Sequence, residues 1–153
     1  MKNNLQLKQE LFLQCVKFVE ERHFKILNQI AEIQESLTSE TKSSAGDKHE
    51  TGRAMMQLER EKAGQQLAEV ERLKEALSQL DVDKISQKIG LGSVVFTTKA
   101  NYFMAISAGQ MTVNSQSFFA ISPNTPIGLL LMGKKVGDAI VFRDHTFVIE
   151  SVG

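Results

Sequence analysis

The sequence is poor in several residues that would narrow its class at once. It has one cysteine, so no intrachain disulfide can form, and it has no tryptophan and a single tyrosine. It also lacks an excess of charge, because lysine plus arginine and aspartate plus glutamate both number 18. A formal net charge of zero gives no bulk field that would attract nucleic acid or an anionic membrane.

Long apolar runs are absent as well. The longest aliphatic cluster, Leu129 to Met132, is far too short to span a bilayer, and residues 1–10 lack the continuous apolar core of a signal peptide. With 153 residues, 42% hydrophobic and 24% charged, the composition is that of a folded protein of one ordinary domain or two small ones. We expect a cytoplasmic protein, which the lone cysteine fits.

The first half carries a helical repeat. An alternating spacing of three and four, uninterrupted by glycine or proline, predicts a coiled-coil seam. Its positions are Leu5, Gln9, Phe12, Val16, Val19, His23, Ile26, Ile30, Ile33 and Leu37. A weaker repeat runs from Met56 to Leu80, after a polar stretch that favours a turn. We predict an antiparallel hairpin over residues 1–80 with its tip at about 41–51; the alternative is a parallel dimer through the first helix.

The second half, residues 81–153, alternates short β-rich runs with turn residues and contains one short helix. Thr125 can cap this helix, Pro126 suits its first turn, and Gly133 can end it. The pattern predicts a small antiparallel β domain, so the whole chain is of the α+β class. Its phenylalanines are mostly expected in the core, although such a cluster could also line a peptide pocket.

Two carboxylates mark the expected hairpin tip. Asp47 and Glu50 are three positions apart, so they share one face if the second helix begins there. The pair can act as a capping box, in which Asp47 accepts from amides of the first helical turn and Glu50 reaches back toward the start of the helix. The same oxygens are also hard ligands suited to Mg²⁺. The spacing leaves both interpretations open.

Two separated motifs carry a family resemblance. Ile121-Ser122-Pro123, Pro126-Ile127-Gly128 and residues 133–138 resemble the C-terminal signature of Gre-type transcript-cleavage factors of bacterial RNA polymerase. That family has a Gly-Asp-x-x-Glu motif at its hairpin tip, and this chain has it at residues 46–50. The resemblance extends from about residue 5 to the end. The chain departs from the family at Lys48-His49, where Leu-Ser is usual. It therefore resembles a divergent member of the Gre family.

The resemblance implies a transcription elongation factor with a globular domain similar to the FK506-binding proteins. It implies that the hairpin enters the secondary channel of RNA polymerase and stimulates cleavage of backtracked RNA, near the nascent 3′ end. Asp47 and Glu50 would share Mg²⁺ with the polymerase, so the protein would not be an enzyme and would bind no cofactor stably alone. We expect a monomer without membrane contact. The expected partner-binding residues are Lys48, His49, Ser122, Pro123, Lys134 and Lys135.

Three other functions remain open from the sequence. Lys48 and His49 make plausible a modulator or inhibitor that occupies the secondary channel without stimulating cleavage. The second half could be a peptidyl-prolyl isomerase or peptide-binding module, although only Tyr102 offers an amphipathic pocket wall. The helices could also form a purely structural adaptor.

Overall fold

The computed structural model describes the backbone of residues 4–42 and 47–153. It describes the side chains of residues 4–39 and 51–153. Its contacts form two compact units, Val19–Lys74 and Met1–Phe18 together with Glu75–Gly153. The first is called the hairpin unit and the second the β unit, and each is described by itself. These contacts group the ends of both helices with the strands, whereas the sequence-based division at residue 80 stays a prediction.

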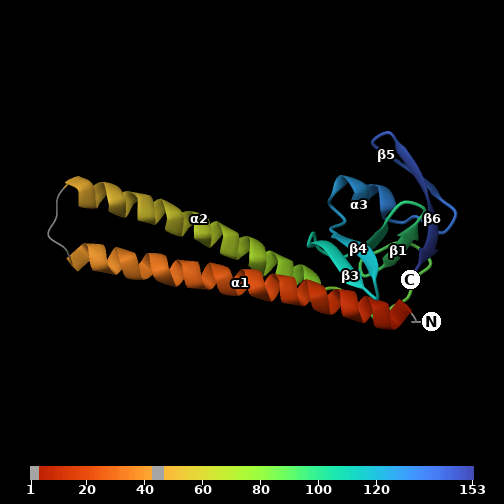
Figure 1. The fold of residues 1–153 in the computed structure, drawn as a ribbon, viewed down its shortest axis with the longest axis horizontal. Helices are drawn as coiled ribbons and strands as arrows, with labels where there is room; N and C mark the ends of the chain where they lie inside the picture. Colours follow the sequence, from red (N-terminus) through yellow and green to blue (C-terminus); the bar gives the residue numbers. More distant parts are fainter. Residues whose placement is uncertain (1–3, 43–46) are drawn as a thin grey trace. The chain divides into compact units, whose positions relative to one another are not determined.

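The hairpin unit consists of parts of α1 (Asn4–Lys42) and α2 (Asp47–Ser78), which Figure 1 shows side by side. The seam is confirmed here, because Val19, Ile26, Ile33 and Leu37 are buried, with Ala63 and Val70 from α2. His23 and Ile30 are half-buried at the intervening positions. No helix in the described part of the chain has the long apolar stretch needed to cross a membrane.

The seam prediction is wrong for the first turns of α1, which belong to the β unit. The buried residues there are Leu7, Lys8, Leu11 and Cys15, whereas Gln9 is exposed and the other predicted positions are half-buried. Packing within the β unit sets this face: Gln14 Nε2 donates to the Thr112 carbonyl at 3.0 Å. The Lys8 ammonium donates to the Lys84 carbonyl, and burial lowers the pKa of Lys8, against the opposing effect of Asp81 and Asp83.

The β unit contains one six-stranded sheet in the order β3-β4-β2-β1-β6-β5. The strands are β1 (Val94–Thr97), β2 (Asn101–Met104), β3 (Gly109–Val113), β4 (Gln116–Ile121), β5 (Ala139–Phe142) and β6 (His145–Val152). The α+β class is confirmed, but the sheet is mixed, because β2 pairs with β4 in parallel. In a simple meander β3 would lie beside β2 and run antiparallel to it. Here the tight β3–β4 hairpin places β4 beside β2 instead, and β4 runs parallel to β2.

The short helix α3 (Pro126–Leu131) contributes Leu131 to the main core cluster. The cluster comprises Ile89, Val95, Met104, Leu131, Ile140, Phe147 and Ile149. Strand alternation buries Phe118 and leaves Phe119 40% exposed beside Tyr102, with ring centroids 6.2 Å apart. Most of the phenylalanines therefore pack in the core, as expected, and Phe119 is the exposed one on β4.

Candidate functional site

The acidic pair lies at the start of the second helix. Since α2 begins at Asp47, Asp47 and Glu50 occupy its first turn, three positions apart. This meets the backbone condition of the predicted shared face. The positive end of the helix dipole also favours carboxylates at this turn. The side chains of Asp47, Lys48, His49 and Glu50 lie outside the described residues, so their roles in metal and partner binding stay predictions.

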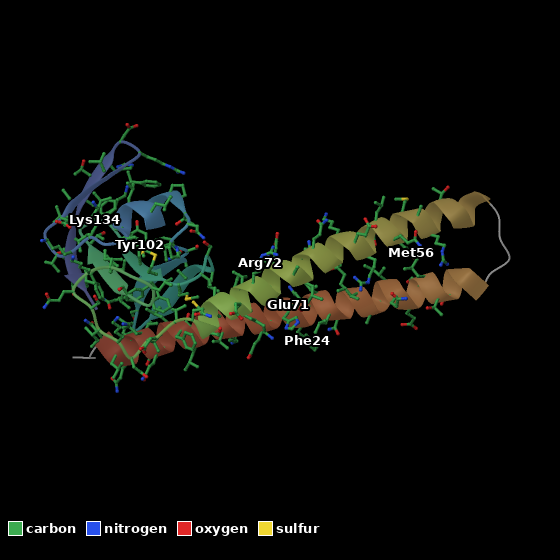
Figure 2. All side chains as sticks on the ribbon, turned by 180° about the vertical axis from the view of Figure 1, so that it is seen from behind. Phe24, Met56, Glu71, Arg72, Tyr102 and Lys134 are labelled. Atoms are coloured by element: carbon green, nitrogen blue, oxygen red, sulfur yellow. The ribbon has the colours of Figure 1, made fainter. Side chains whose placement is uncertain are left out.

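A small apolar cluster holds the helices together near the pair. Ile33, Leu37 and Ala63 are buried, and Ile30 and Met56 pack against them. Figure 2 labels Met56 on α2. Arg53 Nη1 also donates to the Leu37 carbonyl at 3.4 Å, which links α2 to α1 six residues after Asp47. From Val19 to Lys42, α1 rises roughly 35 Å, so the unit can carry the pair well away from its other end.

The Ser122-Pro123 segment forms a tight loop before α3. The Ser122 carbonyl accepts from the Thr125 hydroxyl at 2.7 Å, and the Thr125 hydroxyl accepts from the Gly128 amide at 3.1 Å. Thr125 is thus the N-cap, and Pro126 occupies the first turn, as predicted. A Cβ on Gly128 would lie 2.2 Å from the Ser122 carbonyl oxygen, so this close approach requires glycine.

This part of the signature therefore has a local structural cause. Ser122, Pro126 and Gly128 of the signature act together with Thr125 to cap α3 and seat it against its own loop. Ser122 and Pro123 are half-buried, which leaves part of each side chain accessible. Their predicted contact with a partner is not tested by this geometry.

Lys134 and Lys135 follow α3, so they lie at the opposite end of this helix from Ser122 and Pro123. Gly133 has the predicted left-handed conformation, with φ of 80°, and both lysines are exposed. The Lys134 carbonyl accepts from the Ile89 amide at 2.8 Å, and the Asp138 carboxylate accepts from the Lys135 amide at 2.9 Å. The backbone is thus fixed while the two ammonium groups face solvent.

The structure adds a third lysine that the sequence did not single out. Lys88 and Lys135 form a β-bridge and line a cavity of about 540 Å³ with Gln87, Val136 and Val152. Two ammonium groups beside one cavity favour an acidic partner group. Lys88 was missed because it lies in a stretch that reads as a linker, and only the bridge brings it to Lys135.

The remaining candidates for metal or nucleophilic chemistry are weak. Among residues 4–39 and 51–153, whose side chains the structure describes, no group of three or more His, Cys, Asp or Glu side chains could hold a metal ion. Cys15 is fully buried, and desolvation raises the pKa of its thiol to about 12. The thiol is therefore protonated at neutral pH and cannot act as a ready nucleophile.

The fold and the site define an α+β protein that joins a helical hairpin to a mixed sheet, with two acidic residues at the start of the second helix. No family model and no curated protein matches the sequence. Among solved structures, that of the transcription factor Gfh1 matches with a TM-score of 0.34 and 20% identity, covering 86% of this chain and 92% of that chain. Both values are too low for this likeness to support a function.

Proposed function

We propose that the protein is a Gre-type transcription elongation factor that binds RNA polymerase and stimulates its cleavage of backtracked nascent RNA. One observation carries the proposal: α2 begins at Asp47, so Asp47 and Glu50 of the Gly46-Asp47-x-x-Glu50 motif occupy the first turn of the second helix of the hairpin. A rod of this kind can deliver two carboxylates into a narrow channel. The C-terminal signature supports the same family resemblance from a different part of the chain.

The carboxylates suit the proposed chemistry. Asp47 would be the principal ligand of Mg²⁺ shared with the polymerase, and Glu50 its partner on the metal or on the attacking water. Such a metal neutralises charge on the attacking and leaving oxygens of a phosphodiester. Two carboxylates alone cannot supply that neutralisation. The chemistry therefore belongs to the polymerase active site, and this protein is its accessory factor.

The β unit would hold the polymerase from outside the channel. Ser122 and Pro123 at one end of α3, and Lys134 and Lys135 at the other, are the proposed docking residues. The cavity between Lys88 and Lys135 extends the basic surface. An acidic patch on the polymerase would complement these ammonium groups.

The test uses stalled, backtracked elongation complexes. Wild-type protein should bind the polymerase and shorten the transcript, and Asp47→Ala with Glu50→Ala should bind equally well without shortening it. Lys134→Ala with Lys135→Ala should instead weaken binding while leaving cleavage unchanged at saturating protein. The proposal fails if wild-type protein neither binds nor shortens the transcript.

The modulator that occupies the channel without cleavage is the second candidate, favoured by Lys48 and His49 between the two acidic residues. Restoring the family's usual pair with Lys48→Leu and His49→Ser separates the two. If wild type binds without cleavage and this double variant gains cleavage, the modulator is correct. The prolyl isomerase and adaptor alternatives stay predictions, since no contact in the described residues favours either.

A further inference from the structure

The β unit contains a second cavity, unrelated to the basic one, with a volume of about 730 Å³. Its walls come from the start of α1, the β3–β4 hairpin and the ends of β1, β2 and β6. Phe96 lies in the row of strand residues beneath it, paired with Asn101 on β2 and Ser151 on β6. No motif in the sequence points to these residues.

A β-bulge places a carboxylate in this cavity. Phe96 pairs with Ser151 and Thr97 with Ile149, so Glu150 is an extra residue opposite β1. Successive residues of a regular strand point to opposite faces, yet Glu150 and Ser151 both line the cavity. The bulge accounts for this, since an inserted residue re-aims a side chain, and bulges occur often beside functional sites.

The rim of the cavity is a strained hairpin. Asn114 and Ser115 have φ values of 52° and 66°, the left-handed pair of a tight β3–β4 turn. Asparagine tolerates this conformation, whereas the second position normally takes glycine, and serine adopts it at a cost. Asn114 and Gln116 on either side of Ser115 line the cavity. The turn thus holds two carboxamides at the rim.

The lining carries one negative charge, and its carboxamides offer acceptor oxygens as well as donor NH2 groups. It has carboxamides from Asn4, Asn101, Asn114 and Gln116 and the Glu150 carboxylate, and no lysine or arginine from the described part of the chain lines it. The Asn101 amide nitrogen donates to the Ser117 carbonyl at 3.2 Å, which leaves that group with more acceptor than donor capacity. Glu150 has no side-chain hydrogen bond or ion pair among the residues that the structure describes.

We propose that this cavity binds a guanidinium group, that is, an arginine side chain. The Glu150 carboxylate matches a guanidinium in a two-bond contact, and the Asn101 and Gln116 carboxamide oxygens accept its remaining hydrogens. Phe96 and Leu7 supply apolar surface for the aliphatic stem. Lysine fits less well, because its compact ammonium cannot reach several spread acceptors at once. A phosphate or carboxylate ligand would be repelled by Glu150.

The inference is independent of the transcript-cleavage proposal, because it uses none of the residues at the hairpin tip or around α3. The two therefore fail separately. The guanidinium can come from free arginine or from an arginine in a protein partner, and the probes below distinguish these sources.

The test is a titration of the full chain, followed by amide chemical shifts in two-dimensional NMR. The main probe is the capped peptide Gly-Arg-Gly, with free arginine, Gly-Lys-Gly and Gly-citrulline-Gly as comparisons. Citrulline keeps the shape of arginine and removes its charge. We expect saturable shifts at Phe96, Asn101 and Ser151 with the arginine peptide, and at least tenfold weaker binding of the citrulline and lysine peptides. Equal binding of free arginine assigns recognition to the side chain alone, and tighter peptide binding assigns it to a protein partner.

Two variants and a control make the test specific to Glu150. Glu150→Gln should weaken the arginine peptide at least tenfold, whereas Glu71→Gln on the exposed face of α2 should change nothing. Gln116→Glu adds a second carboxylate at the exposed rim and should tighten binding without affecting the citrulline peptide. Equal binding of the arginine and citrulline peptides, tighter binding of a neutral sugar such as methyl glucoside, or no shift at the cavity would each overturn the proposal.

Discussion

The hairpin unit and the β unit bury their apolar side chains in different ways. The hairpin buries one line of small and medium side chains, such as Ile33 and Ala63, and leaves Phe24 on α1 67% exposed (Figure 2). The β unit buries whole aromatic rings, among them Phe103 and Phe118, at 0% exposure. A sheet with a helix packed against it can enclose large residues, whereas two helices alone enclose only a seam.

The difference bears on where function lies. The proposed carboxylates are on the unit with the thinner packing, where Met56 and Arg53 connect their helix to α1. The proposed docking and guanidinium sites are on the unit with the deep core, where a bulge and tight turns hold their residues. We expect the β unit to contribute most of the free energy of unfolding. In the proposed function, the hairpin unit carries the two carboxylates.

The largest expected contrast comes from the same truncation in the two units. Phe118→Ala removes a fully buried ring that contacts Phe96 edge to face at 5.7 Å, and should lower the free energy of unfolding by about 3–5 kcal/mol. Phe24→Ala, on the exposed side of α1, should change it by less than about 0.5 kcal/mol. Urea denaturation of both variants measures this. Equal losses would break the contrast between the units.

The next effect tests the loop that seats α3. Gly128→Ala places a methyl group 2.2 Å from the Ser122 carbonyl oxygen and 2.8 Å from the Thr125 hydroxyl, so the loop must move. We expect a loss of about 2–4 kcal/mol, comparable to other strongly overpacked or strained sites. Gly133→Ala is the matched control, because it has open space and only a positive φ to strain it, worth about 1–2 kcal/mol. A smaller loss for Gly128→Ala than for Gly133→Ala would contradict the close approach.

A pH effect should localise to the β unit. Burial raises the pKa of the Cys15 thiol from 9.0 to about 12, so between these values the unfolded chain loses a proton that the folded chain keeps. Stability contributed by this thiol is therefore complete below about pH 9 and falls as the pH rises, by up to about 1.4 kcal/mol per pH unit. Cys15→Ala should remove this slope, whatever its effect at pH 7. Urea denaturation at pH 8, 9 and 10 measures it, and an unchanged slope in the variant would refute the assignment.

The smallest expected effect lies in the hairpin. Gly52→Ala in α2 meets no atom within 4 Å and should stabilise the helix by up to about 1 kcal/mol. Amide hydrogen exchange of residues 51–60 reports the gain locally. Since the hairpin is a separate unit, exchange in β2 and β4 should stay unchanged. A change that reached those strands would mean that the two units unfold together.

The sequence predicts what depends on local spacing. The buried seam from Val19 to Leu37 follows from its own repeat, and the Thr125 cap with Pro126 follows from turn chemistry. The failures depend on contacts distant in the chain. Burial of Leu11 and Cys15 needs the first turns of α1 to pack within the β unit, and the parallel pairing of β2 with β4 depends on which strand the β3–β4 hairpin brings alongside.

The candidate sites divide in the same way. Asp47 and Glu50 stand out in the sequence because three positions separate them near a turn. Glu150 does not stand out, because a single carboxylate in an alternating strand is typical of a solvent-facing residue. Only the bulge shows that its side chain lines the same cavity as that of Ser151. Lys88 is similar, since it meets Lys135 only through an isolated bridge.

The most direct test of the proposed role of the hairpin is the Mg²⁺ dependence of transcript cleavage in backtracked complexes, with wild type and Asp47→Asn at saturating concentrations. Asparagine keeps the size of the side chain and removes its charge. Wild type should lower the Mg²⁺ concentration needed for half-maximal cleavage, and Asp47→Asn should return it to the value of polymerase alone while still binding. If both proteins bind and give the same Mg²⁺ dependence, Asp47 is not a metal ligand in the complex and the account of the tip is wrong.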